Sequence, residues 1–283
     1  MGIILGLLAA LLYGSSDFAG GLASRRMTSV SVNMIGGIAA GVTVWAALLA
    51  SGGHAPAIGP VLWGVAGGLG GGLGSLALYR GLARGQMSVV GPVSAVSAAV
   101  VPVVAGLALG ERLGLLTIAG IVVALPAIGL VAASGGGFGG GKLGVSLIDG
   151  LSAGAAFGVL FIALARAGSH AGLWPVAAEN TSSLLVFIAF KIAAKPAKRE
   201  ARAAVAPRQA GLAVFSGVSG AAATLMFFFS AHVSMLATAA VIVSLYPGVT
   251  MVLARIVLHE RFSGVQRVGI GPCAFAVVAI AAH

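Results

Sequence analysis

The chain has 283 residues, of which 59% are hydrophobic and only 8% are charged. A water-soluble domain usually carries about 25% charged residues, so a soluble globule of this length could not cover its own surface. This composition excludes an ordinary soluble enzyme, a disordered protein and an extended nucleic-acid binder. Lys and Arg number 16 against 6 Asp and Glu. They lie in short clusters between apolar runs, which is typical of loops that face an anionic membrane surface.

Glycine makes up 45 of the 283 residues. In water, glycine destabilises a helix by about 1 kcal/mol relative to alanine. In lipid, helices persist because the backbone must satisfy its own hydrogen bonds, and small residues let them approach closely. High glycine content combined with high hydrophobicity therefore predicts closely packed membrane helices. The single cysteine, Cys273, excludes an intrachain disulfide. No His, Asp or Glu cluster has metal-ligand spacing, so neither a metal nor a cofactor is expected.

The apolar runs predict an all-α integral membrane protein with ten transmembrane helices of about 20 residues each. No Lys or Arg precedes the first run, so it lacks the basic region of a signal peptide and is interpreted as a span. Too little chain remains for a soluble domain. The predicted spans are Ile3–Ser24, Ser29–Ala50, Gly59–Tyr79, Ser88–Leu109, Gly114–Ala133, Leu143–Ala165, Leu173–Phe190, Ala210–Ser230, Ala237–Leu258 and Ser263–Ala282.

The chain contains an internal repeat. A Gly-rich segment, 134–142, is typical of a flexible linker and separates residues 1–133 from residues 143–283. Each half holds five predicted spans, and an odd number forces the halves into opposite orientations. Such inverted repeats are a common plan of secondary transporters, with the site near the membrane midplane. A shift of 144 positions pairs Gly6 with Gly150 and Gly14 with Gly158, and a shift of 149 pairs Glu111 with Glu260 and Arg112 with Arg261.

This pattern resembles the EamA family of the drug/metabolite transporter superfamily. The resemblance rests on five spans repeated twice, on the pair Tyr13-Gly14 in the first span, and on Glu-Arg closing the fourth and ninth spans. One departure is Ala98, which stands where its counterpart in the second half is Pro247. The resemblance implies a ten-helix carrier with a central cavity, often an exporter of small metabolites. It also implies that spans one, three and four, with six, eight and nine, frame the cavity.

Charge distribution leaves the orientation open. Thirteen of the sixteen Lys and Arg lie in odd-numbered connections and two in even-numbered ones. The positive-inside rule then places both termini outside the cytoplasm, whereas relatives in the EamA family are usually drawn with cytoplasmic termini. Six of the thirteen lie between Lys191 and Arg208, so one misplaced span would weaken the count.

Two carboxylates within spans are the sharpest candidates for a site. An ionisable group inside the bilayer costs about 2.5–3.5 kcal/mol on insertion scales and usually has a functional reason. Asp17 shares a helical stripe of small and polar residues with Tyr13, and Glu179 lies next to Asn180 in the seventh span. All four are predicted to bind substrate, and Asp17 and Glu179 to couple protons. The alternatives are a headgroup or Arg contact for Asp17 and an interhelical hydrogen bond or capping role for Glu179.

Further substrate-binding candidates lie in the third, fourth and ninth spans. Ser97 corresponds to Tyr246 under the repeat, and Ser94 lies one turn before Ser97. Prolines in the fourth and ninth spans can break these helices and free backbone groups for a ligand. Tyr79 can stack on an organic substrate or cation, as can Trp63. The alternative for each aromatic residue is core packing or an interfacial position. The prolines are Pro92, Pro102 and Pro247, and the remaining weaker candidates are Asn33 and His232.

These features predict a secondary-active transporter in the bacterial inner membrane. Its partners would be a small organic solute and lipid, not nucleic acid, and it would act as a monomer or homodimer. An intramembrane serine protease is one alternative, because 150–154 matches G-x-S-x-G and Ser152 could pair with His232. A passive channel is the other alternative. Residues 136–142 match the first seven positions of the P-loop motif, G-x-x-x-x-G-K. Leu143 stands where the motif needs Ser or Thr, and a membrane span rather than a strand precedes the segment, so a nucleotide-binding loop is rejected.

Overall fold

The computed structural model describes residues 1–52, 57–83, 87–110, 143–193 and 206–258, with 114, 115, 118, 119, 122, 123 and 126. Most of the predicted fifth span, the whole tenth span and the linker 134–142 lie outside these residues. The Glu-Arg pairs at 111–112 and 260–261 also lie outside them. The total of ten spans therefore stays a prediction.

Every regular element in the described part of the chain is helical, and six of these helices are long and apolar enough to cross a membrane. For the described residues this confirms the predicted all-helical, membrane-type fold. The elements are α1 (Gly2–Ser24), α2 (Ser29–Ala50), α3 (Ile58–Ala83), α4 (Met87–Ala108), α6 (Leu143–Arg166), a short 3-10 turn η1 (Ser169–Ala171), α7 (Trp174–Ala193), α8 (Pro207–Val233), α9 (Leu236–Val243) and α10 (Tyr246–Leu258).

Local sequence signals explain several helix ends. Thr28 caps α2, because its hydroxyl accepts a hydrogen bond of 3.3 Å from the backbone N–H of Ser31. Gly52 follows the end of α2 at φ +65°, a conformation that favours glycine. Pro207 is the first residue of α8, where a missing N–H costs nothing. α3 runs past the predicted end at Tyr79, so Arg80 lies in the helix rather than in a connection.

The predicted ninth span is broken in two. α9 ends at Val243 and α10 begins at Tyr246. Pro247 has no N–H with which to bond the carbonyl of Val243, and the N–H of Leu245 bonds the carbonyl of Ile242, three residues back, over 3.2 Å. A break beside Pro247 is what the sequence predicts. In the fourth span, by contrast, α4 continues through both of its prolines.

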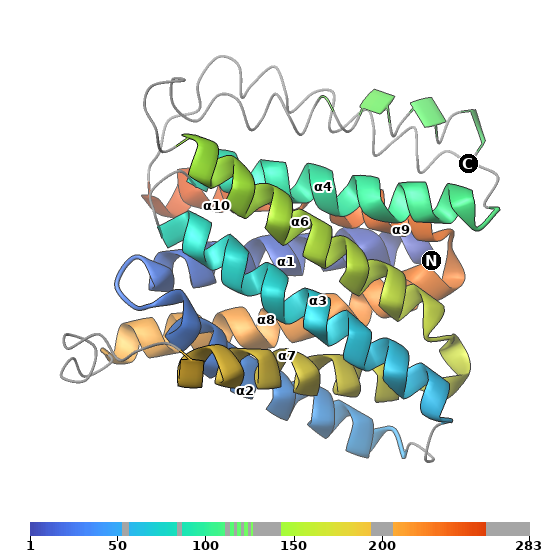
Figure 1. Ribbon diagram of the computed structural model, residues 1–283, viewed down its shortest axis with the longest axis horizontal. Coiled ribbons are helices and arrows are strands. Elements are labelled where there is room, and N and C mark those ends of the chain that lie inside the picture. The colour runs from blue at the N-terminus through green and yellow to red at the C-terminus, as the bar shows by residue number, and fades with distance from the viewer. Residues whose placement is uncertain are drawn as a thin grey trace.

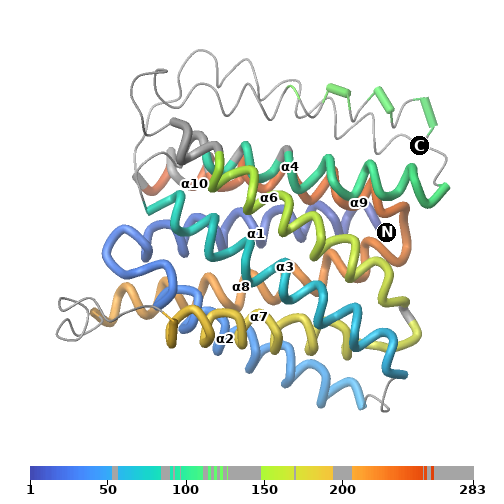
Figure 2. The backbone as a smooth tube through the Cα atoms, in the orientation of Figure 1, coloured from blue at the N-terminus to red at the C-terminus, as the bar shows by residue number. Residues whose placement is uncertain are grey.

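The helices form one bundle whose axes run roughly together across the view (Figure 1). α1 packs most extensively on α8, α3 packs on α6 and α7, and α4 packs on α6. The tube view shows α1 through the middle of the bundle, starting at the right, whereas α6 starts at the left (Figure 2). The first helix of each half therefore runs in the opposite direction to the other.

Equivalent glycines contact equivalent helices in the two halves. A Cβ at Gly6 would lie 3.0 Å from the Cγ2 of Ile242, and a Cβ at Gly150 would lie 2.9 Å from the Cβ of Val93. The shift of 144 positions relates Gly6 to Gly150, and the shift of 149 relates Val93 to Ile242. The close approach of α1 to α9 thus repeats that of α6 to α4.

Large apolar side chains cover the outside of the bundle. A soluble monomer rarely exposes wide contiguous apolar patches, but a lipid-facing surface requires them. On the first three helices this exposed set includes Ile4, Leu8, Leu11, Ile38, Val42, Leu49, Leu62, Leu69 and Leu73.

Glycine at the crossing of α2 and α8 supports a stability prediction. A Cβ at Gly217 would overlap the carbonyl of Gly36, whereas a Cβ at Gly211, in the same helix, would meet nothing within 4 Å. Forcing an extra group into a packed crossing costs about 1–3 kcal/mol. We expect Gly217→Ala to lower the melting temperature of the purified protein in detergent by several degrees. Gly211→Ala should leave it unchanged or raise it, and an equal loss in both variants would contradict the crossing.

Candidate functional site

A cavity of about 130 Å³ lies among α1, α2, α3, α6, α7, α8 and the start of α10. One water needs about 10–15 Å³ on a comparable measure, so the space suits several waters or a small organic molecule. Its described polar lining consists of Tyr13, Ser16, Asp17, Asn33, Ser75, Tyr79, Glu179, Asn180, Ser183, Ser216, Thr224 and Tyr246.

Hydroxyl groups of α1, α3 and α8 form one polar wall. The Tyr79 Oη lies 2.9 Å from the Oγ of Ser216, and the Ser16 hydroxyl donates to the Ser216 carbonyl over 2.8 Å. The Tyr13 Oη lies 2.9 Å from the Oγ1 of Thr224. These contacts connect the two halves and hold both tyrosine rings in place.

The ring of Tyr79 lies directly against the backbone of α1. A Cβ added at Gly20 would overlap this ring, so the glycine opens the space that the tyrosine fills. Tyr79 is buried although it comes only four residues before the end of α3. The buried position of the Tyr79 ring therefore depends on the missing side chain at Gly20 of α1, together with the hydrogen bond to Ser216.

Asp17 lines the cavity from α1. Among the described residues its carboxylate forms no hydrogen bond, and the one ion pair found there joins other residues. No ion pair of Asp17 with Arg25 or Arg26 is found among the described side chains. A carboxylate left in this way is available to a ligand, a proton or water.

Glu179 is 6% exposed and enters the cavity from α7. Its Oε1 accepts a hydrogen bond of 3.1 Å from the Ser183 hydroxyl, and a Cβ at Gly71 would lie 3.0 Å from the same oxygen. The next residue, Asn180, has a buried Oδ1 with no donor among the described atoms. α7 thus presents one partly satisfied acceptor, Glu179, to the cavity, whereas the Oδ1 of Asn180 lies against Gly41 of α2.

The helix break supplies the last element of the site. Tyr246 is the first residue of α10, is 5% exposed and lines the cavity. Its Oη has no hydrogen-bond partner in the described part of the structure. Its ring meets that of Tyr13 edge-on, with centroids 6.5 Å apart. This hydroxyl is enclosed by protein, with the Ser94 hydroxyl beside it, so Tyr246 contributes its ring rather than its Oη to the cavity.

The two serine candidates of the fourth span lie elsewhere. Neither Ser94 nor Ser97 is among the residues that line the cavity. Ser97 donates to the carbonyl of Val93 over 2.9 Å. A Cβ at Gly154 of α6 would overlap the Cβ of Ser97 and the backbone carbonyl oxygen of Ser94. The family resemblance implies a cavity framed by spans one, three, four, six, eight and nine. The described lining differs from this set, because it includes residues of α2 and α7 and none of α4.

The weaker candidates lie outside the cavity, except Asn33, which lines it and donates to the carbonyl of Ser29 over 2.9 Å. The guanidinium of Arg166 lies 5.9 Å from the ring centroid of Trp63. Nδ1 of His232 lies 2.7 Å from the carbonyl oxygen of Phe228. The structure does not support pairing of His232 with Ser152, whose hydroxyl bonds the carbonyl of Ile148 in its own helix over 2.7 Å.

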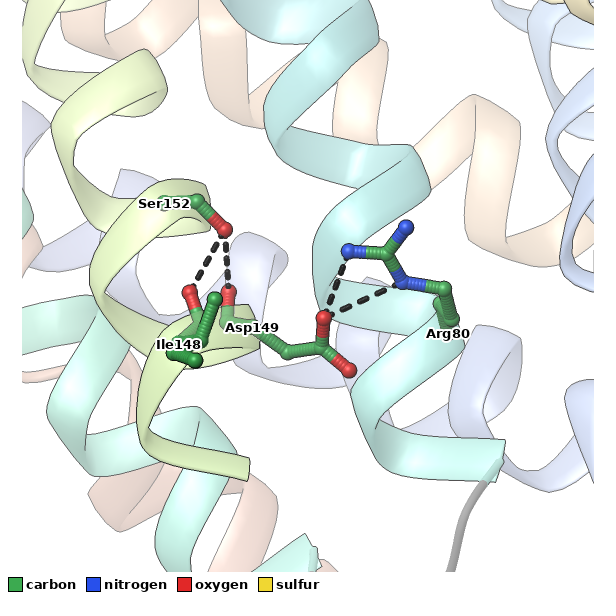
Figure 3. Close-up of polar contacts among 4 residues, drawn as sticks. All are labelled: Arg80, Ile148, Asp149 and Ser152. Atoms are coloured by element: carbon green, nitrogen blue, oxygen red, sulfur yellow. Dashed lines mark hydrogen bonds and ion pairs between the residues drawn. The ribbon is translucent and has the colours of Figure 1, made fainter. Parts of the chain in front are cut away.

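A buried ion pair joins α3 to α6 (Figure 3). Both Nη2 and Nε of Arg80 donate to the Oδ1 of Asp149, the latter over 3.0 Å. Asp149 is 2% exposed and Arg80 is 49% exposed. The sequence analysis did not single out either residue as a partner of the other. Asp149 is an acidic residue in a predicted span, so the rule that identified Asp17 would have identified it too.

The other residues that the sequence analysis missed are hydroxyl and aromatic side chains of the lining. Single Ser and Thr residues are common in membrane helices and usually bond their own backbone, so nothing distinguishes them before the helices are assembled. They are Ser16, Ser75, Ser183, Ser216, Thr224, Phe157, Phe161 and Phe187.

The ion pair generates a double-mutant prediction. Removing one partner of a buried pair leaves an uncompensated charge, which costs about 3–5 kcal/mol when fully buried and less here because Arg80 is half exposed. We expect Arg80→Ala to lower the melting temperature in detergent by several degrees, and Arg80→Ala/Asp149→Asn to recover part of that loss. Melting losses that simply add would show that the two side chains do not interact.

Comparison with known proteins adds the family. No curated protein matches the chain. A solved structure titled "Crystal structure of protein" superposes with a TM-score of 0.78 at 16% identity, covering 98% of this chain and 95% of that one, which supports the fold alone. The family model described as "EamA-like transporter family" matches residues 1–133 and 142–282. The matched residues span nearly the whole chain, in two stretches that correspond to its halves. The chain therefore belongs to the EamA-like transporter family, whose members are membrane transporters rather than enzymes.

Proposed function

We propose that the protein exports a small organic solute across the bacterial cytoplasmic membrane by alternating access, with the solute bound in the cavity. The observation that carries this proposal is a polar cavity built from both halves of the chain and enclosed within an apolar bundle. A purely structural bundle would fill this space with apolar side chains, because unfilled volume and unpaired buried polar groups both reduce stability.

The arrangement of the two halves supports alternating access. α1 and α6 run in opposite directions (Figure 1), and their glycine contacts with α9 and α4 correspond. Inverted halves have two equivalent ways to pack, each of which opens the shared site to one side of the membrane. Rocking between the two packings would carry the solute across. We extend this to the whole chain as ten spans in two inverted five-helix repeats, 1–133 and 143–283, joined by 134–142.

Asp17 and Glu179 are the proposed proton-coupling groups. Both line the cavity, and neither has a basic partner among the described residues. The other titratable side chains of the described lining are the phenols of Tyr13, Tyr79 and Tyr246. A proton taken up by either carboxyl group on one side and released on the other would link solute export to proton entry.

This coupling predicts the behaviour of two conservative variants. Cells that overproduce the protein should release a solute into the medium, identified by comparing metabolites with those of cells lacking it. In proteoliposomes loaded with pyranine, that solute should drive proton flux in the wild type. We expect Asp17→Asn and Glu179→Gln to reduce this flux by at least tenfold, because neither amide takes up the proton.

Ser152→Ala is the matched control, because Ser152 is exposed on the outside of α6 and does not line the cavity. It should retain full flux, and loss of flux in this variant would instead point to the serine chemistry of the alternative interpretation. Retained proton flux in both carboxylate variants would remove Asp17 and Glu179 from coupling. Transport without saturation or stimulation by solute on the far side would indicate a passive channel.

A further inference from the structure

The charges that line the cavity are all of one sign. Asp17 and Glu179 are its two carboxylates, and no Lys, Arg or His occurs in the described lining. Arg80 follows the lining residue Tyr79 in the chain, but its guanidinium pairs with Asp149. A solute that carries a carboxylate or phosphate would meet two like charges there and no opposite charge, which is unfavourable in a poorly solvated site.

The unsatisfied hydrogen-bonding groups have the same preference. The carboxylate of Asp17 has no donor in the described part of the chain. Glu179 receives a single hydroxyl donor at Oε1. These are acceptors that need hydrogen-bond donors, and a primary ammonium group supplies three N–H donors with one positive charge.

Aromatic rings complete the environment. Tyr13 lies edge-on to Tyr246 and tilted against Phe161, with centroids 6.5 and 6.4 Å apart. Cations are attracted to the faces of such rings, and an apolar or aromatic substituent of the solute can pack against Phe157, Phe161 and Phe187 in the same lining.

We propose that the cavity recognises a small organic cation, a primary ammonium on an apolar or aromatic body, whose charged nitrogen binds between the carboxylates of Glu179 and Asp17. This inference names the class of solute that the cavity binds, and it rests on the proposed function for the claim that the bound solute is transported. A cation held by the same carboxylates that accept protons competes with them, so solute and proton would occupy the site in turn.

Three probes of nearly equal shape test the preference for charge. 2-Phenylethylammonium carries the cation, 2-phenylethanol is its neutral counterpart, and 3-phenylpropanoate is the anion. Binding of each to the protein in lipid nanodiscs is measured by isothermal titration calorimetry. We expect the ammonium to bind at least about tenfold more tightly than the alcohol, the size typical of a hydrogen bond to a charged group, and the anion more weakly than the alcohol.

Variants assign the preference to the named residues. Glu179→Gln and Asp17→Asn should each reduce ammonium affinity about tenfold or more while changing alcohol affinity little, and Ser152→Ala should bind all three probes as the wild type does. Each variant is accepted only if its melting temperature and elution profile match those of the folded wild type. Should one carboxylate variant fail to fold, the other still decides.

Equal affinity for ammonium and alcohol, or no ammonium binding by protein that exchanges its exported solute, overturns the cation inference and leaves the carrier proposal standing. The opposite result is also possible: the protein binds the ammonium probe through Glu179 but shows no saturable exchange of solute. It supports the cation site and rejects the carrier.

Discussion

Close approach of helix backbones at glycine is the constraint on which the rest of this structure depends. At the crossing of α3 and α7, Gly68 leaves no room for a side chain, and the Ser182 hydroxyl donates to the carbonyl of Val65 over 2.9 Å. Water cannot compete for such bonds inside a bilayer, so short polar contacts hold the helices together where lipid supplies little hydrophobic driving force. The same approach carries Glu179 into the cavity. The packing that stabilises the bundle is therefore also what builds the site.

The halves are alike in packing but not in charge. Under the two shifts, Asp149 corresponds to Leu5 and Arg80 to Phe229, so the ion pair between α3 and α6 has apolar counterparts in α1 and α8. Breaking a buried pair exposes charges that need water or new partners, whereas separating apolar side chains in a membrane costs mainly packing. One of the two equivalent interfaces thus carries an electrostatic contact that the other lacks.

Several features followed from the sequence without the tertiary structure. Hydropathy placed α2 at its observed bounds and α1 within a residue, because any 20-residue apolar stretch in lipid must satisfy its backbone as a helix. Pro247 correctly indicated the broken ninth span. α3 extends further than expected because Arg80, which hydropathy treats as the end of a span, is neutralised by a residue 69 positions away. Ser94 and Ser97 are on the right helix for the repeat, but neither is in the described lining. The Ser97 side chain packs against Gly154 of α6, and the Ser94 hydroxyl lies beside that of Tyr246.

By itself, then, the sequence determined that this is a helical membrane protein with two related halves. Of the eight residues that it predicts to bind substrate, six are in the described lining of the cavity, and their role stays a prediction. These are properties of single helices and of spacing along the chain, namely hydrophobic length, intramembrane charge and recurrence. Only the tertiary structure decided which helices enclose the cavity, that α2 and α7 belong to it, and that Asp149 is paired while Asp17 is left open to the cavity. Those outcomes depend on the rotation of each helix about its axis and on which backbones glycine allows to meet, and both are set by contacts between residues far apart in the chain.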